Sequence, residues 1–89
     1  MKTNAIRTDP NDNVVVVFRA IKAGEAVICG AGLELKANED IMKNHKVAVR
    51  DIPANSPVIK YGEVIGLATR PIRSGDWVHT HNLRSEESE

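Results

Sequence analysis

The sequence has 89 residues, which is enough material for one small domain but not for two. Its twelve basic and twelve acidic residues cancel to a formal charge of zero, and no Lys/Arg stripe is interleaved with aromatic residues, so nucleic acid is not an expected partner. The single Cys29 rules out an internal disulfide and a zinc site built on paired cysteines. No apolar run is long enough for a signal peptide or a membrane span, so we expect no membrane contact and a cytoplasmic location.

The first half of the chain predicts short strands separated by turns. We expect residues 1–12 to be a flexible N-terminus. Val14–Phe18 is β-branched except for its last residue and does not alternate, which predicts a central strand covered on both faces. Ala26–Cys29 and Leu33–Ala37 predict two more strands around a glycine loop. Asn38–Asn44 predicts one helical turn capped by its first residue.

The second half continues in the same style, with strands expected at His45–Arg50, Val58–Tyr61, Val64–Thr69 and Trp77–Leu83. Short strands about ten residues apart with Gly, Pro or Asn between them indicate an all-β fold, either barrel-like or a compact folded ribbon. We place this domain at residues 13–83 and expect residues 84–89 to form an acidic, solvated tail.

One seven-residue pattern recurs at Ile21–Val27, Ile52–Val58 and Ile72–Val78. Each copy reads Ile-x-(Ala/Ser)-(Gly/Asn)-x-x-Val. Gly and Asn are the residues that adopt a positive φ at the lowest cost, so we interpret each copy as a turn with an apolar anchor on either side. The unequal spacing of the copies argues against a solenoid.

Two of the three histidines stand in the stretch Trp77–Leu83. If this stretch is a strand, Trp77, His79 and His81 share one face, and the two imidazoles can flank a substrate, an anion or a metal. A His-x-His pair alone is a weak metal signal, because a zinc or iron site needs a third protein ligand, and both side chains can equally face solvent. His45 is a surface or turn histidine in the plain interpretation, and completes a cluster if it lies beside the others. Trp77 is expected chiefly to pack in the core.

Two glycines flank a short strand in Tyr61–Gly66. The pair predicts a tight turn and a bulge; in the alternative interpretation its backbone amides approach a ligand, with Lys60 as a cation. No phosphate-binding glycine fingerprint is present, and Cys29 is expected to be a small core residue. The residues alone therefore predict an all-β module with a histidine-lined edge, and do not by themselves indicate catalysis.

Several dispersed motifs occur in an order that resembles a known family. They are His45-Lys46-Val47-Ala48, Asp51-Ile52-Pro53-Ala54-Asn55, Val58-Ile59-Lys60-Tyr61-Gly62-Glu63-Val64-Ile65-Gly66 and Ile72-x-x-Gly75-x-x-Val78-His79-Thr80-His81-Asn82-Leu83, with weaker similarity at Asp12-Asn13-Val14 and Ile21-Lys22-Ala23-Gly24. In these motifs the chain is similar to the N-terminal domain of the altronate/galactarate dehydratase family, a small SAF-type β-clip domain.

The resemblance implies a function as well as a fold. Enzymes of that family are lyases that remove water from sugar acids with a divalent metal, iron or manganese, and their catalytic body is much larger than this chain. The chain then resembles a small subunit that completes the active site of a separate large catalytic subunit, with self-association as a further option. By the same resemblance His45, His79 and His81 are catalytic, Lys60, Tyr61 and Gly62 bind the sugar-acid substrate, and His79 and His81 contribute to a metal held mainly by the large subunit.

Two other functions stay open at this point. A related branch of split enzymes has a similar architecture but eliminates sulfite from (2R)-sulfolactate, and its alpha subunit would suit this sequence too. The third option is a non-catalytic β-clip module that serves assembly or binds carbohydrate.

Overall fold

Nine short strands in three small sheets build the part of the chain that the computed structural model describes, residues 2–30 and 32–85. The strands are β1 (Ala5–Ile6), β2 (Val14–Val17), β3 (Ala26–Gly30), β4 (Leu33–Lys36), β5 (Lys46–Ala48), β6 (Pro57–Lys60), β7 (Glu63–Ala68), β8 (Trp77–Val78) and β9 (Leu83–Ser85). The prediction of an all-β fold is confirmed. The three sheets stay open and do not close into a barrel. A helix able to cross a membrane is absent from the described part of the chain.

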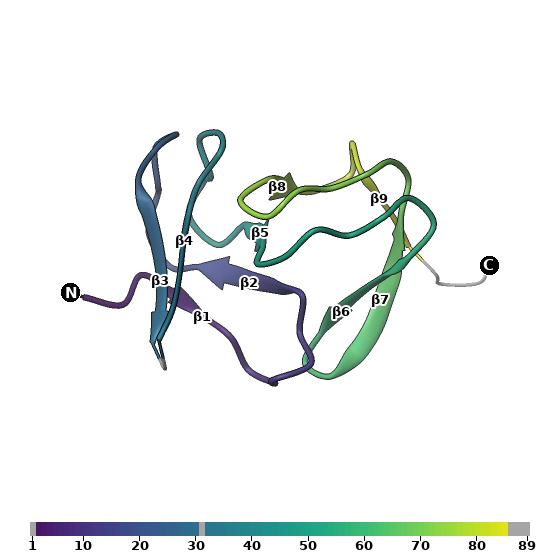
Figure 1. Ribbon diagram of the computed structural model, residues 1–89, viewed down its shortest axis with the longest axis horizontal. Helices are drawn as coiled ribbons and strands as arrows, with labels where there is room; N and C mark the ends of the chain where they lie inside the picture. The colour runs from purple at the N-terminus through teal and green to yellow at the C-terminus, as the bar shows by residue number, and fades with distance from the viewer. Residues whose placement is uncertain (1, 31, 86–89) are drawn as a thin grey trace.

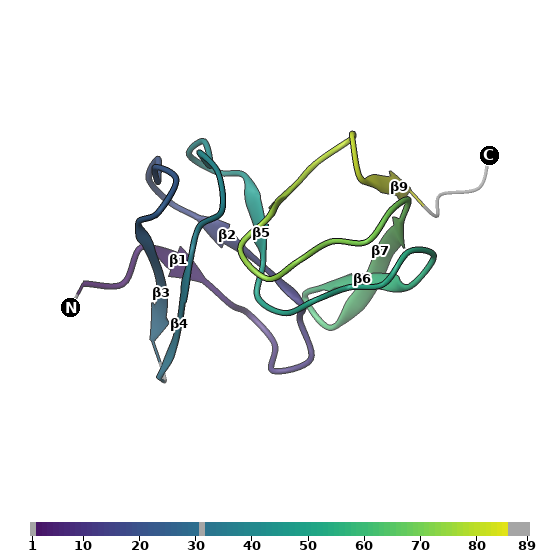
Figure 2. The same cartoon turned by 45° about the horizontal axis from the view of Figure 1, so that its top comes forward.

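A four-stranded antiparallel sheet, in the order β1-β2-β5-β8, occupies the middle of the molecule. The β3-β4 hairpin lies at one end and the β6-β7-β9 sheet at the other, as Figures 1 and 2 show from two directions. In β2 the side chains of Val15 and Val17 pack toward the first end and that of Val14 toward the second, and all three are buried. The predicted central strand, covered on both faces, is therefore confirmed.

Each end of the molecule has its own core of aliphatic side chains. The first cluster holds Ala5, Val15, Val17, Ile21, Val27, Ala37, Ile41 and Val47, and the second holds Val14, Ala48, Ile52, Val58, Ala68, Ile72 and Val78. Full burial of one such Val or Ile side chain contributes about 1.5–3 kcal/mol, so the two clusters supply the main driving force for folding. The central sheet separates them and belongs to both.

The seven-residue turn pattern occurs four times in the structure, once more than the sequence indicated. The fourth copy is Ile41–Val47, whose third position is Lys43 instead of Ala or Ser. The fourth position of every copy has a positive φ: 89° at Gly24, 70° at Asn44, 68° at Asn55 and 95° at Gly75. The copies meet in pairs through the bridges Ile21↔Ile41 and Ile52↔Ile72, so each core cluster is closed by two turns.

The helical turn predicted at Asn38–Asn44 is wrong. The polar side chains that suggested a helix cap bond to other turns instead: Asp40 Oδ1 accepts from the Ala23 amide, and Glu39 Oε2 accepts from the Trp77 amide. Asn38 Nδ2 donates to the Ser74 carbonyl. These long-range bonds hold the segment in bends that join β4 to the fourth turn copy.

The expected flexible start at residues 1–12 is also wrong for the residues described. Ala5 is buried in the first core, and β1 pairs with the end of β2. Asn4 binds strand β3 with both ends of its amide: Nδ2 donates to the Ala26 carbonyl, and Oδ1 accepts from the Ile28 amide. Of the expected acidic tail, residues 86–89 lie outside the described part of the chain, while Arg84 and Ser85 belong to β9.

The strand expected over Trp77–Leu83 is confirmed only for its first two residues. After Val78 the chain makes a tight turn, in which the His79 carbonyl accepts from the amides of Asn82 and Leu83. Asn82 is 4 % exposed, and its Oδ1 accepts from the His79 amide while its Nδ2 donates to the Trp77 carbonyl. A buried asparagine therefore sets the loop that carries the histidines.

Candidate functional site

Three imidazoles gather around the indole of Trp77. The ring centroid of Trp77 lies 5.7 Å from that of His45, 5.3 Å from that of His79 and 4.8 Å from that of His81. The His79 ring is stacked on the indole, and its centroid is 4.9 Å from that of His45. The predicted strand is replaced by a turn, yet the three histidines named from the sequence do form one cluster.

His45 reaches the cluster because β5 and β8 are neighbours. Val47 pairs with Trp77 across these strands, which brings the residue two before Val47 alongside the indole. Trp77 Nε1 donates to His45 Nδ1 at 3.0 Å. This bond selects one tautomer of the neutral imidazole, with its hydrogen on Nε2. Trp77 therefore orients His45, which goes beyond the core-packing role expected for it.

His79 favours the neutral form of its imidazole more than a free histidine does. Loss of hydration lowers the pKa of His79, and the neighbouring His45, Lys46 and His81 lower it further. At neutral pH the His79 ring therefore carries one N–H and one free lone pair, which is the form that accepts a proton from a substrate.

The described residues do not by themselves provide a metal site. Within 2–30 and 32–85, no group of three His, Cys, Asp or Glu side chains is arranged to hold a metal ion. The Nδ1 lone pair of His45 is already used by Trp77. A metal shared with this cluster would need its main ligands from elsewhere.

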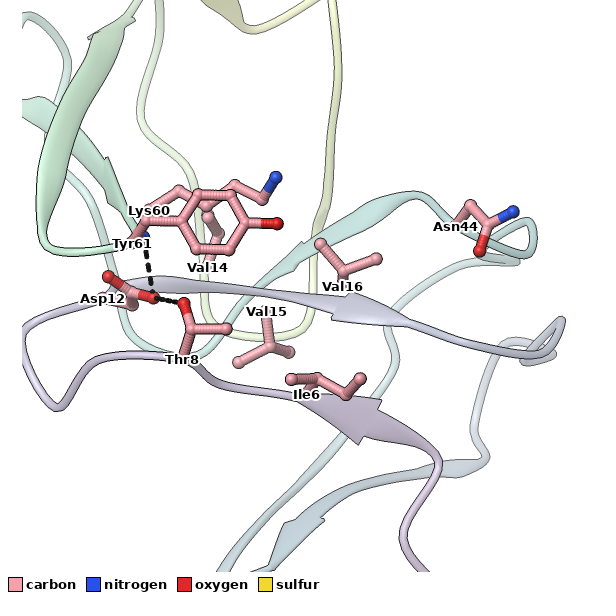
Figure 3. A pocket seen from close by; sticks show the side chains of 9 residues that line it. All are labelled: Ile6, Thr8, Asp12, Val14, Val15, Val16, Asn44, Lys60 and Tyr61. Carbon is pink, nitrogen blue, oxygen red and sulfur yellow. Dashed lines mark hydrogen bonds between the residues drawn. The ribbon is translucent and has the colours of Figure 1, made fainter.

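A second group of predicted residues lines a groove of about 260 Å³ beside β2. Its lining is Ile6, Thr8, Asp12, Val14, Val15, Val16, Asn44, Lys60 and Tyr61. Figure 3 shows the Lys60 ammonium and the Tyr61 hydroxyl pointing the same way along this groove, above the valines of β2. The Lys60 Nζ lies 4.2 Å from the centroid of the Tyr61 ring, a cation–π contact that holds both side chains.

Asp12 holds the turn that carries these two residues. Its carboxylate accepts from the amides of Tyr61 and Gly62 and from the Thr8 hydroxyl (Figure 3 shows the Tyr61 and Thr8 bonds). Burial opposes ionisation of Asp12, which is 1 % exposed, but these hydrogen bonds outweigh it and keep its pKa below the usual value. The sequence predicts only a flexible N-terminus at Asp12, because a carboxylate that binds amides far along the chain has no local pattern.

Gly62 therefore has a structural part in this turn. Its amide, predicted above to approach a ligand in the alternative interpretation, already donates to Asp12 Oδ1 at 2.8 Å. Its φ is 73°, and a Cβ at this position would come within 2.7 Å of Asp9 Oδ2. Only glycine fits there without a shift of that carboxylate.

Comparison with known proteins assigns the chain to a family. The altronate/galactarate dehydratase SAF domain matches residues 3–86. The chain belongs to this family. The SAF domain is 33 % identical over 84 residues to an altronate dehydratase of Bacillus subtilis, and 45 % identical over 75 residues to a galactarate dehydratase (L-threo-forming) of Escherichia coli. Those alignments cover 94 % and 82 % of this chain but only 17 % and 14 % of the two enzymes.

A third relative is similar over its whole length. The SAF domain is 32 % identical over 92 residues to a (2R)-sulfolactate sulfo-lyase subunit alpha of Chromohalobacter salexigens, and the alignment covers 97 % of this chain and 98 % of that subunit. The same fold is thus found as a small segment of dehydratases and as nearly all of a lyase subunit.

Proposed function

We propose that this chain is the small subunit of a lyase that acts on a hydroxylated acid, in which it completes the active site of a separate large catalytic chain. The similarity to subunit alpha of a sulfo-lyase over 98 % of that subunit carries the proposal. The imidazole cluster supports it, because three histidines stand at a partly open surface without the further ligands that a self-sufficient metal site needs. A cytoplasmic location is part of the same proposal.

The reaction we favour is dehydration of a sugar acid such as altronate or galactarate. We propose that the large chain holds the divalent metal of the assembled enzyme, iron or manganese, since the described residues of the SAF domain do not supply a ligand set. Neutral His79 accepts or returns a proton at the substrate, and His45, oriented by Trp77, and His81 face the same space. Lys60 and Tyr61 bind the hydroxylated acid in the neighbouring groove.

Sulfite elimination from (2R)-sulfolactate is the second candidate, favoured by the coverage of the sulfo-lyase subunit. Both reactions remove a leaving group next to a carbon that loses a proton, so the same imidazoles would serve either. A chain that only assists assembly is the non-catalytic alternative.

The test is turnover of the assembled enzyme. The chain is purified with its large partner, and loss of altronate, galactarate or sulfolactate is followed for the unaltered complex, which identifies the substrate. In that complex the double variant His79→Ala/His81→Ala should lower turnover by about 10²–10⁴-fold, the range for loss of a general acid or base.

The matched control is Lys22→Ala, an exposed side chain that lies in neither the imidazole cluster nor the groove. It should leave turnover unchanged. Size-exclusion chromatography establishes that both variants stay in the complex. If the double variant assembles and turns over substrate at the full rate, the catalytic role of the histidines is wrong and only the assembly role remains. Failure to find any large partner would overturn the subunit proposal.

A further inference from the structure

Lys46 is a half-buried cation that has so far appeared only as a member of the motif His45-Lys46-Val47-Ala48. It lies on β5, paired with Val16 on β2 and Val78 on β8. Within residues 2–30 and 32–85 it forms no ion pair with a carboxylate. Loss of hydration lowers the pKa of Lys46, and the positive charge of Lys60 lowers it further. The fold therefore places an ammonium where it is poorly solvated and repelled by a second one.

Lys46 lines a cavity of about 240 Å³ that is distinct from the Lys60–Tyr61 groove. The cavity is lined by Lys46, Ile65, His79, Thr80, Leu83 and Ser85, and shares no lining residue with that groove. An ammonium, an imidazole and a hydroxyl thus meet above an apolar wall of Ile65 and Leu83. This combination of one charge, two hydrogen-bonding groups and an apolar wall is typical of a site for a small polar ligand.

The charges around the cavity call for a negative partner. The Lys46 ammonium lies close enough to lower the pKa of His79, as do the imidazoles of His45 and His81, so this face disfavours a further positive charge. A cation that is partly desolvated and unpaired destabilises the free protein, and a bound anion removes that cost. Lys60 differs from Lys46, because the Tyr61 ring already compensates part of its charge.

We propose that this cavity is an oxyanion site, in which Lys46 pairs with a carboxylate or sulfonate of a small acid and His79 and Thr80 supply hydrogen bonds. That the bound anion is the anionic end of the substrate rests on the proposed function. This assignment moves the contact with the anion from Lys60 to Lys46. The cavity is then the place where the acid is anchored beside His79. The ligand class is a small acid with hydroxyl groups next to its carboxylate.

The first experiment uses the full chain alone, labelled with ¹⁵N, and titrates it with galactarate at low salt. Amide shifts should be confined to the neighbourhood of Lys46, His79 and Thr80. Galactitol, which has the same carbon skeleton without carboxylates, should produce no such shifts. Equal shifts with galactitol, or shifts centred on Tyr61 instead, would overturn the proposal.

The variants separate the two lysines. Lys46→Met removes the charge while keeping an unbranched side chain, and should weaken galactarate binding by about tenfold or more, as expected for loss of a charge-assisted bond. Lys46→Arg should retain most of the affinity, and Lys22→Met, which removes an exposed cation outside the cavity and the groove, should change it by less than about threefold. Lys46→Met should also raise the melting temperature, by about 2–4 °C, because it removes a partly desolvated cation that has no carboxylate partner among residues 2–30 and 32–85. Undiminished binding by Lys46→Met, or loss of binding with Lys60→Met alone, would refute the assignment.

These results do not depend on the large chain. If no partner assembles but galactarate binds at Lys46, the proposed function fails and the anion site stands. If the complex turns over its substrate normally with Lys46→Met, the site fails while the subunit proposal stands.

Discussion

The two ends of this molecule are built on the same hydrogen bonds but carry different chemistry. At one end Asn4 Nδ2 donates to the Ala26 carbonyl at 2.9 Å and Oδ1 accepts from the Ile28 amide at 2.7 Å. At the other end Asn13 Nδ2 donates to the Pro57 carbonyl at 3.0 Å, and its Oδ1 accepts from the Ile59 amide at 2.7 Å.

The turns repeat in the same way. The Gly24 amide donates to the Ala37 carbonyl and the Asn55 amide to the Ala68 carbonyl. The counterparts on the turns and strands, such as Gly24 and Asn55 or Ile28 and Ile59, are 31 positions apart, whereas the anchors Asn4 and Asn13 are nine apart. The scaffold is therefore an internal repeat, and positions that agree in both halves serve the fold.

The positions that differ are the ones with functional groups. Immediately after the matched isoleucines, the first hairpin has Cys29 and Gly30 where the second has Lys60 and Tyr61. Because one chain holds two copies of the same architecture, the positions that agree identify the scaffold and the positions that differ identify the candidate site. The candidate site belongs to the second copy and to the sheet between the two.

The largest effect is expected where the two halves differ in what a turn tolerates. Asn44 and Gly75 are counterparts with positive φ, but a Cβ on Gly75 would collide with the Lys36 carbonyl. Gly75→Asn should therefore cost about 3 kcal/mol or more of unfolding free energy, and Asn44→Gly less than about 1 kcal/mol. Urea unfolding of both variants measures this. Equal costs would mean that the two turns are interchangeable.

The next effect tests the common scaffold. Asn4→Ala and Asn13→Ala each remove a buried side chain and leave a backbone carbonyl and a backbone amide without their partner, so each should cost about 2–3 kcal/mol. The two costs should agree within about 1 kcal/mol, because the bonds are the same in both halves. The exposed Asn11→Ala serves as the control in the same urea experiment. A variant of either anchor that is as stable as the control would contradict the repeat as a scaffold.

The sequence revealed the scaffold better than the site. Apolar runs located most strands, and a positive φ at Gly24, Asn55 and Gly75 followed from residue type alone. The copy at Asn44 was missed because the residue before it is Lys43, which breaks the local pattern. The site depends on strand pairing between distant segments, since His45 meets Trp77 only through β5 and β8.

A smaller effect distinguishes the second hairpin from the first. Asp12→Asn places an amide nitrogen against a backbone N–H, and should cost about 1–2 kcal/mol at neutral pH. The pKa of Asp12 is lower in the folded protein than in the unfolded chain, where it is about 3.9. The difference in unfolding free energy between the unaltered protein and Asp12→Asn should therefore be complete above the unfolded pKa and disappear as pH falls through the folded pKa. Denaturation at several pH values measures it.

Asp51→Asn is the matched control, because this exposed carboxylate accepts a single amide hydrogen bond, from Ser74. It should change stability by less than about 0.5 kcal/mol. A pH-independent loss in Asp12→Asn would show that the shape of the turn matters and the charge does not.

The smallest effect concerns the charge environment of His79, which no position of the first half reproduces. The folded protein binds a proton at His79 less readily than the unfolded chain, whose histidines titrate near about 6.5. The unfolded state therefore binds more protons between the folded pKa of His79 and that value, and the free energy of unfolding falls as pH drops through this window. NMR titration of the histidine rings should give His79 the lowered pKa, and Lys46→Met should raise it because one repelling charge is lost. Lys22→Ala should leave it unchanged, so an equal shift in both variants would mean that net charge, and not the position of Lys46, controls this imidazole.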